Sequence, residues 1–345
     1  MSDLPGYIFS RWVTQNLLLI GSFALVYFLL RLGARNERWQ RAWIRLKRDR
    51  TGLIALGVIC LYLLIGALEY LQIPLKNGRG GTRSILDAFT SHVRVERSYS
   101  APLAEAPLYT TRDEKLSAPR THLLGTDVLG KDVFIEPLKA CRTALIIGGL
   151  TTAIYIPLGT LLGIMAGYFR RWVDDIIQYL YSTLASIPEI LLLVAILLVR
   201  GKGLGNISFA LGVTGWVTLC RLIRGETMRQ AERPYVTAAR ALGQTHWNII
   251  TRHLLPNVMH LVLISAILGF SNIVLAEAIL SYLGVGVPVG TPSWGAMIDN
   301  GRSELSREPF VWWNITTATV ALFGLVLSLN ILGDSLRRAF DPKRT

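Results

Sequence analysis

The chain has 345 residues, of which 51% are hydrophobic and only 17% are charged. A soluble domain usually carries about 25% charged residues, so the composition argues against an ordinary soluble enzyme and favours a membrane protein. The formal net charge is +13. The basic residues flank apolar runs, which is typical of contact with anionic membrane lipid. No zinc-finger spacing, RNP pattern or basic helical arm accompanies them, so nucleic acid is excluded as the expected partner.

Seven apolar stretches are long enough, or nearly so, to cross a membrane as helices, which takes about 17–25 mostly apolar residues. They predict an all-α polytopic membrane protein with spans at Asn16–Leu32, Thr51–Leu71, Ala140–Phe169, Ile176–Val199, Leu204–Leu222, Val258–Leu283 and Asn314–Gly333. The first stretch lacks a small-residue cleavage site and its positive charges follow it, so we interpret it as an uncleaved anchor.

The distribution of arginine and lysine predicts the topology, because both are enriched in cytoplasmic loops. The segment between the first two spans, residues 31–50, is strongly basic, which places the amino terminus outside. Seven crossings then place the carboxyl terminus in the cytoplasm, in agreement with Arg337, Arg338, Lys343 and Arg344. Arg200 and Lys202 disagree weakly with this assignment.

Two segments outside the spans carry their own predictions. Trp39, Trp43 and Leu46 occur at helical spacing among arginines, which predicts a helix in the inner membrane interface; a helix that docks a partner is the alternative. The external segment Gln72–Lys139 is longer than an ordinary connection and is either a solvated insertion or a surface for an external partner. Near its end, we expect Asp127 or Asp132 to cap the helix that leads into the third span.

Three ionisable residues within the spans are functional candidates by default: Arg142, Glu189 and Glu277. Arg142 and Glu277 are close enough to span ends to pair or to reach the interface, so a structural role is the favoured alternative for them. No chain of carboxylates or histidines runs through the spans, and the sequence therefore carries no sign of a proton relay.

No pattern of catalytic or metal-binding residues occurs. HExxH, GxSxG and GxxxxGK[ST] are absent, and the five histidines and three cysteines lack metal or disulfide spacing. We therefore predict a chain without catalytic residues, without a metal and without a bound cofactor; an intramembrane enzyme is the alternative class.

The stretch YVTAARALGQTHWNIITRHLLPN, residues 235–257, is polar and basic although it lies between two apolar spans. On a helix its small and apolar residues gather toward one side: Tyr235, Val236, Ala238, Ala239, Leu242 and Gly243. Gly243 weakens that helix, and Pro256, after Leu255, is expected to turn the chain in a new direction. The pattern predicts a short cytoplasmic helix that another protein approaches closely; a solvated loop is the alternative.

This stretch resembles the EAA loop of ABC-importer permeases, a short helix that sits in a groove of the ATPase subunit. Thr237-Ala238-Ala239, Gly243 and the ending His253-Leu254-Leu255-Pro256 follow the family's spacing, although the family's glutamate is absent. Further blocks are similar to the dipeptide/oligopeptide and nickel branch of that family: GTDVLGKDVF (125–134), ACRTAL (140–145), EAILSYLGVGVPVGTPSWGAMIDNGR (277–302) and NILGDSLRRAFDP (330–342). Ser182 departs from the pattern, since an acidic residue is expected there.

The resemblance implies a type I ABC-importer permease fold with one extra amino-terminal span, in a bacterial inner membrane. It divides the chain into residues 1–50, with the extra span and the basic interfacial segment, residues 51–139, with the first core span and the long external loop, and residues 140–345, the permease core with the coupling loop at 228–257. The coupling residues it implies are Tyr235, Val236, Ala238, Ala239, Leu242, Gly243, Leu255 and Pro256.

The same resemblance implies partners and a load. The partners are a second permease, two ATPase subunits that bind ATP and Mg, and an external substrate-binding protein. The implied load is a peptide carried by alternating access, with a nickel chelate, an antimicrobial peptide or a glycopeptide as alternatives. A secondary carrier or a membrane scaffold is the alternative class, although neither midplane carboxylates nor inverted repeats occur in the sequence.

Overall fold

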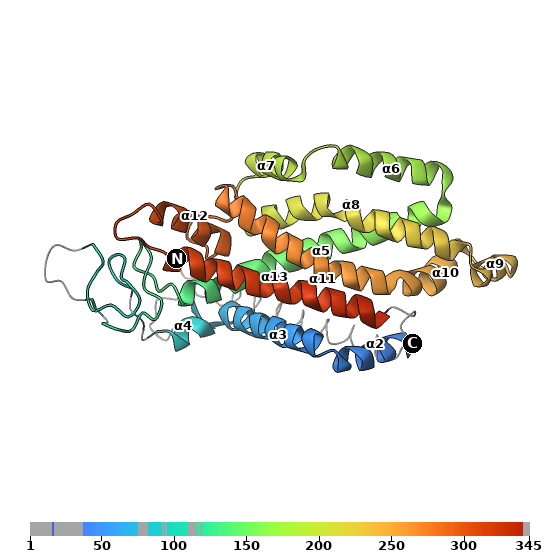
Figure 1. Cartoon of the computed structure of the whole chain (residues 1–345). Coiled ribbons are helices and arrows are strands. Elements are labelled where there is room, and N and C mark those ends of the chain that lie inside the picture. The colour runs from blue at the N-terminus through green and yellow to red at the C-terminus, as the bar shows by residue number, and fades with distance from the viewer. Residues whose placement is uncertain are drawn as a thin grey trace, which may run out of the picture. The chain divides into compact units, whose positions relative to one another are not determined.

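The computed structural model describes residue 16 and residues 37–74, 82–91, 93, 95–109, 116–117 and 119–340. These residues form helices and one short two-stranded sheet, so the predicted all-α membrane class is confirmed (Figure 1). The predicted first span, Asn16–Leu32, lies outside the described residues apart from Asn16. The chain divides into two compact units: unit 1 comprises residues 1–145, 281–284 and 289–328, and unit 2 comprises residues 146–280, 285–288 and 329–345.

Unit 1 is built from membrane-crossing helices and the loops between them. Its elements are α2 (Glu37–Arg48), α3 (Arg50–Tyr70), β1 (Gln72–Pro74), β2 (Thr82–Ser84), α4 (Ile85–Phe89), α12 (Trp294–Glu304), the start of α5 (Ile135–Phe169) and the start of α13 (Trp313–Phe340). The helix expected before the second span is α2, in which Leu46 is buried and Trp43 is exposed. The strands β1 and β2 pair antiparallel.

An aspartate fixes the start of α5. Asp132 Oδ1 accepts hydrogen bonds from the backbone N–H groups of Phe134 at 2.8 Å and Ile135 at 3.2 Å. It thereby satisfies donors that the first turn of a helix leaves unpaired. Of the two expected caps Asp132 is the one used, whereas Asp127 accepts from the N–H group of Leu129 in the preceding turn.

Unit 1 also buries a carboxyl group at the end of α12. Glu304 is 1% exposed and accepts hydrogen bonds of 3.1 Å from the Tyr99 hydroxyl and from Asn314 Nδ2. Burial raises the pKa of Glu304, and the two hydrogen bonds offset only part of that rise. Burial, together with the charge of Glu304, also raises the pKa of Tyr99 to about 12. The cluster ties α12 to the start of α13 and to the loop that carries Tyr99.

Unit 2 contains the remaining helices. They are the rest of α5, α6 (Arg171–Ala185), α7 (Glu189–Arg200), α8 (Leu204–Ala231), α9 (Pro234–Ala241), α10 (His246–Ile249), the π-helical turn η1 (Ile250–Leu254), α11 (Leu255–Tyr282) and the end of α13. In Figure 1, α9 lies beyond the end of α8, and α10 lies at the end of α11.

Glycines on α5 allow α8 to approach its backbone. A Cβ atom placed on Gly163 would lie 2.9 Å from the carbonyl oxygen of Cys220, and one on Gly167 would lie 2.7 Å from that of Arg224. Small residues at such crossings let membrane helices pack closely where lipid supplies no hydrophobic drive. The end of α5 is therefore held tightly against the part of α8 that leads into the segment of residues 228–257.

The spans differ from the prediction in one place. Among the described residues, five helices are long and apolar enough to cross a membrane: α3, α5, α8, the run His246–Tyr282 and α13. The predicted span Ile176–Val199 is not a straight helix, because α6 and α7 meet at an angle of 85° around residues 186–188. Pro188 lacks an N–H group and disfavours helical backbone at Ile187, which hydropathy alone does not register. The span count is five, or six if the bent pair crosses, so the count of seven stays a prediction.

Candidate functional site

The segment of residues 235–257 forms a short helix with well-defined ends. Pro234 opens α9 at a position where its missing N–H group costs nothing. At the other end Gly243 has φ +73°, its N–H group donates to the Arg240 carbonyl at 3.0 Å, and the Gln244 N–H group donates to the Ala239 carbonyl at 3.1 Å. This bond pair is the glycine-based Schellman ending of a helix. The expected interruption at Gly243 is therefore confirmed.

One face of α9 packs into unit 2. Val236 and Ala239, 0% and 4% exposed, belong to a buried apolar cluster that we term the hairpin core: Tyr168, Ala231, Val236, Ala239, Ile249 and Leu254. The sequence pattern predicted Val236 and Ala239 on a surface that contacts another protein, but both side chains are buried. An eight-residue helix is too short to be stable alone, so its apolar face is buried on its own chain.

The opposite side of α9 is open to solvent. Tyr235, Ala238, Leu242 and Gly243 are exposed, and Leu242 has 81% of its surface accessible. We term these four residues the outer surface of α9. An exposed leucine beside small residues, on a helix fixed from behind, is suited to contact with another protein.

A tyrosine at the end of α5 contacts both α9 and α10, and we term these two helices and the turn between them the hairpin. The Tyr168 hydroxyl lies 2.8 Å from His246 Nδ1, in hydrogen-bond contact, and the Arg240 guanidinium carbon lies 4.8 Å from the centre of the Tyr168 ring. Tyr168 is 5% exposed. One side chain therefore joins α5, α9 and α10. Its local sequence is that of an ordinary tyrosine at the end of a span and carries no signal of this role.

A second set of contacts closes the hairpin at its base. The Tyr235 hydroxyl donates to Gln230 Oε1 at 2.8 Å and accepts from Asn257 Nδ2 at 3.1 Å. Tyr235 thus bridges the end of α8 and the start of α11. Leu255 and Pro256, just before Asn257, were predicted to turn the chain in a new direction. They do not, because His246–Tyr282 runs as one helical stretch. The π-helical turn η1 widens the hydrogen-bond ladder where Pro256 has no N–H group to donate and its ring crowds the preceding turn.

Ion pairs hold α6 and the α5–α6 corner against α8. Arg224 donates to both carboxylate oxygens of Asp174, from Nε at 2.5 Å and from Nη2 at 2.7 Å. Asp174 is 8% exposed, so this two-point bond is largely protected from water. Arg170 and Glu232 form a second pair at 2.7 Å that is exposed and contributes less.

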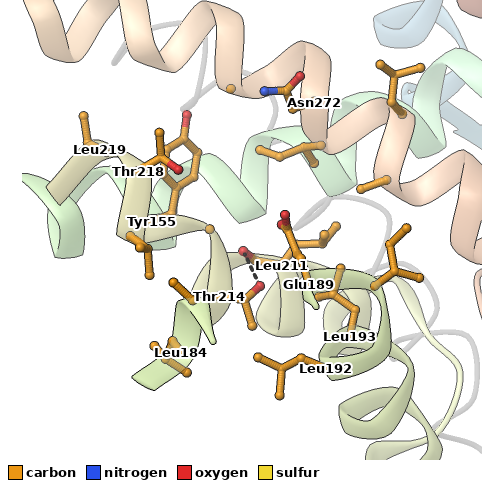
Figure 2. A pocket seen from close by; sticks show the side chains of 18 of the residues that line it. Tyr155, Leu184, Glu189, Leu192, Leu193, Leu211, Thr214, Thr218, Leu219 and Asn272 are labelled. Carbon is orange, nitrogen blue, oxygen red and sulfur yellow. Dashed lines mark hydrogen bonds between the residues drawn. The ribbon is translucent and has the colours of Figure 1, made fainter. Parts of the chain in front are cut away.

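The three intramembrane candidates do not belong to one unit. Arg142 lies in unit 1, where its guanidinium carbon is 5.3 Å from the Tyr70 ring centre, a contact typical of a structural cation. Glu277 is 1% exposed in unit 2. Glu189 is the first residue of α7 and lines a cavity of about 820 Å³ that also belongs to unit 2. Figure 2 shows the Glu189 side chain extending into that cavity.

Comparisons with known proteins agree on one family. A family model described as "Binding-protein-dependent transport system inner membrane component" matches residues 159–345. The chain is 35% identical over 222 residues, 64% of this chain and 73% of the relative, to the glutathione transport system permease protein GsiD of Pectobacterium atrosepticum. It is 29% identical over 308 residues, 88% of this chain and 90% of the relative, to the dipeptide transport system permease protein DppC of Alkalihalophilus pseudofirmus.

Among solved structures, the chain is similar to a structure of the MetNI methionine ABC transporter in an inward-facing conformation. The TM-score is 0.45 at 21% identity, and the match covers 59% of this chain and 93% of the other. A likeness of this size carries no conclusion about function.

Proposed function

The chain belongs to the family of binding-protein-dependent transport system inner membrane components, and on that premise we propose that it is a permease subunit of an ATP-driven peptide importer, coupled to its ATPases through α9. Similarity to permease proteins named for dipeptide and glutathione transport supports a short peptide as the load. A nickel chelate, an antimicrobial peptide or a glycopeptide is the alternative load.

The observation that carries the coupling role is the two-sided packing of α9. Val236 and Ala239 bind the helix to the hairpin core, and Leu242 on its other side is 81% exposed. A force applied to the outer surface therefore reaches the rest of unit 2 through a buried contact rather than being absorbed by a mobile loop. Packed interiors transmit displacement in this way because they are close-packed.

The proposed assembly follows the family pattern. This chain pairs with a second permease, two ATPase subunits hold ATP and Mg, and a substrate-binding protein delivers the load from outside. The chain itself supplies no catalytic residue, metal ligand or cofactor site in this proposal. Its amino terminus lies outside and its carboxyl terminus in the cytoplasm, so α9 is on the ATPase side of the membrane; the basic residues near the span ends support this orientation.

In the proposed mechanism, ATP binding closes the ATPase pair and moves α9. Tyr168, bonded to His246 and stacked against Arg240, passes that movement to the end of α5. The close contact of α5 with α8, and the Asp174–Arg224 pair between α6 and α8, make these helices move together. The spans then reopen toward the outside to receive the next load, as alternating access requires.

Co-purification from native membranes in mild detergent tests the coupling surface. The tagged chain is expected to bring with it a second permease, ATPases and a binding protein. Leu242→Asp places a charge on the outer surface without disturbing the core, so the ATPases should be lost while the second permease is retained. Val289→Asp is the matched control, because Val289 is 97% exposed on a loop of unit 1. Retention of the ATPases by Leu242→Asp would refute the assignment of this surface.

A further inference from the structure

We propose that the cavity of unit 2 is a binding station for a zwitterionic peptide, in which Glu189 binds the peptide's amino-terminal ammonium group and Arg221 binds its carboxylate. The proposal rests on the proposed function, since it names where this chain holds the load during transport. The cavity has a volume of about 820 Å³. This is within the usual range of roughly 300–1,000 Å³ for small-molecule sites.

The cavity contains polar side chains that make no hydrogen bond or ion pair with the described residues. Glu189, Thr218 and Asn272 line it, and none of the three has a hydrogen bond or ion pair with the part of the chain that the structure describes. All three belong to the apolar helices α7, α8 and α11. Unpaired polar groups are costly in lipid, so residues of this kind face water, a ligand or another protein chain. This face of unit 2 is therefore not lipid-facing.

The arrangement of charge selects the ligand class. Most of the lining is apolar, including Leu192, Leu193 and Leu211, which suits apolar side chains. The lining carries one carboxylate, Glu189, and one guanidinium, Arg221. A molecule with an ammonium group, a carboxylate and apolar groups between them complements this surface. A free peptide has these features, whereas a nickel chelate or a purely anionic solute lacks the ammonium group.

The spacing of the two charges limits the peptide's length. Figure 2 shows Glu189 near the part of α8 that carries Leu211 and Thr214. Arg221 lies seven residues beyond Thr214 on α8, which is about 10 Å along the helix axis at a rise of 1.5 Å per residue. The Arg221 guanidinium is held over the Tyr181 ring at 4.8 Å, which limits its movement. An extended tripeptide spans about 10 Å, so tripeptides fit the distance better than long oligopeptides.

Equilibrium binding of trileucine to the purified complex of both permeases and the ATPases, without the binding protein, tests the station. Omitting the binding protein removes its own selectivity. The wild-type complex should bind trileucine more tightly than N-acetyl-trileucine or trileucine amide. Glu189→Gln should weaken trileucine binding about tenfold or more and abolish the preference over the acetylated form, because a charge-assisted hydrogen bond is lost. Arg221→Gln should abolish the preference over the amide. Glu232→Gln, outside the cavity, is the matched control and should change neither.

The alternative is that Glu189 pairs with a cation of the second permease. In that case Glu189→Gln would weaken recovery of the second permease and would lower the binding of trileucine and of its acetylated form equally. That result, or a wild-type complex that does not distinguish the three peptides, overturns the station. ATP-driven uptake with the binding protein present is measured in parallel. If uptake persists while the binding preference is absent, the station fails and the importer assignment stands; if uptake and ATPase recovery are both absent, the proposed function itself fails.

Discussion

Replacement of Tyr168 tests how α9 is connected to the membrane helices. Tyr168→Phe removes only the hydroxyl that contacts His246, and it keeps the ring beneath Arg240. A net hydrogen bond contributes about 0.5–1.5 kcal/mol. His246 is exposed, so water replaces the lost partner and the cost lies at the lower end of that range. We therefore expect Tyr168→Phe to retain most of the uptake.

Tyr168→Ala removes the ring itself. Tyr168 is 5% exposed in the hairpin core, and truncation of a buried aromatic ring costs about 3–5 kcal/mol. Because each 1.4 kcal/mol is a factor of ten, the open state of the hairpin should become roughly 10² to 4 × 10³ times more populated. Hydrogen exchange of the amides that close α9, such as Leu242 N–H bonded to the Ala238 carbonyl, should accelerate by the same factor.

The functional assay is peptide uptake per ATP hydrolysed in proteoliposomes. Tyr168→Ala should keep the ATPases bound, since the outer surface of α9 is unchanged, but uptake per ATP should fall sharply. Tyr179→Ala is the control, because Tyr179 is 73% exposed in the same unit. Normal uptake per ATP in Tyr168→Ala, with accelerated hydrogen exchange in α9, would refute the view that force passes through the hairpin core.

Three further predictions concern single positions. Gly243→Asp should abolish uptake while membrane insertion stays normal. The substitution puts a negative charge on the outer surface of α9, at the negative end of the helix dipole. Normal uptake by this variant would contradict the coupling role. Glu304→Gln should raise the unfolding temperature of the detergent-solubilised complex at neutral pH and above. Because the pKa of Glu304 is raised, the stability that its protonated carboxyl group contributes is present below the pKa of an unfolded glutamate and is lost as the pH rises through the folded value. If the amide variant kept the wild-type dependence of unfolding temperature on pH, this assignment would be contradicted. Asp174→Asn should destabilise unit 2 by about 3 kcal/mol, because Arg224 loses the negative charge and one of the two oxygens that it binds. The exchanged pair Asp174→Arg with Arg224→Asp should restore part of the thermal stability, and no loss in the single variant would show that water already screens the pair.

Most of the membrane architecture was predictable from local sequence. Long apolar runs specify spanning helices because lipid offers no partner for an open backbone, and the all-α class is confirmed on that basis. The bend at Pro188 was not predicted, because hydropathy reports how apolar the side chains are and carries no information on backbone geometry. The first span, the orientation and the division of residues 1–50, 51–139 and 140–345 remain predictions.

The sequence by itself determined that a short helix lies before Gly243 and ends there, because glycine readily adopts the left-handed conformation that ends a helix. Only the tertiary structure decided which face of that helix points outward. Val236 and Ala239 are small and apolar whether they contact a partner or their own core, and their burial depends on Tyr168, which is distant in sequence. The same holds for Glu189, since a carboxylate at the start of α7 becomes part of a cavity only when α8 and α11 pack beside it. Sequence periodicity gives the sides of a helix, but the neighbours of each side are set by contacts between residues far apart in the chain.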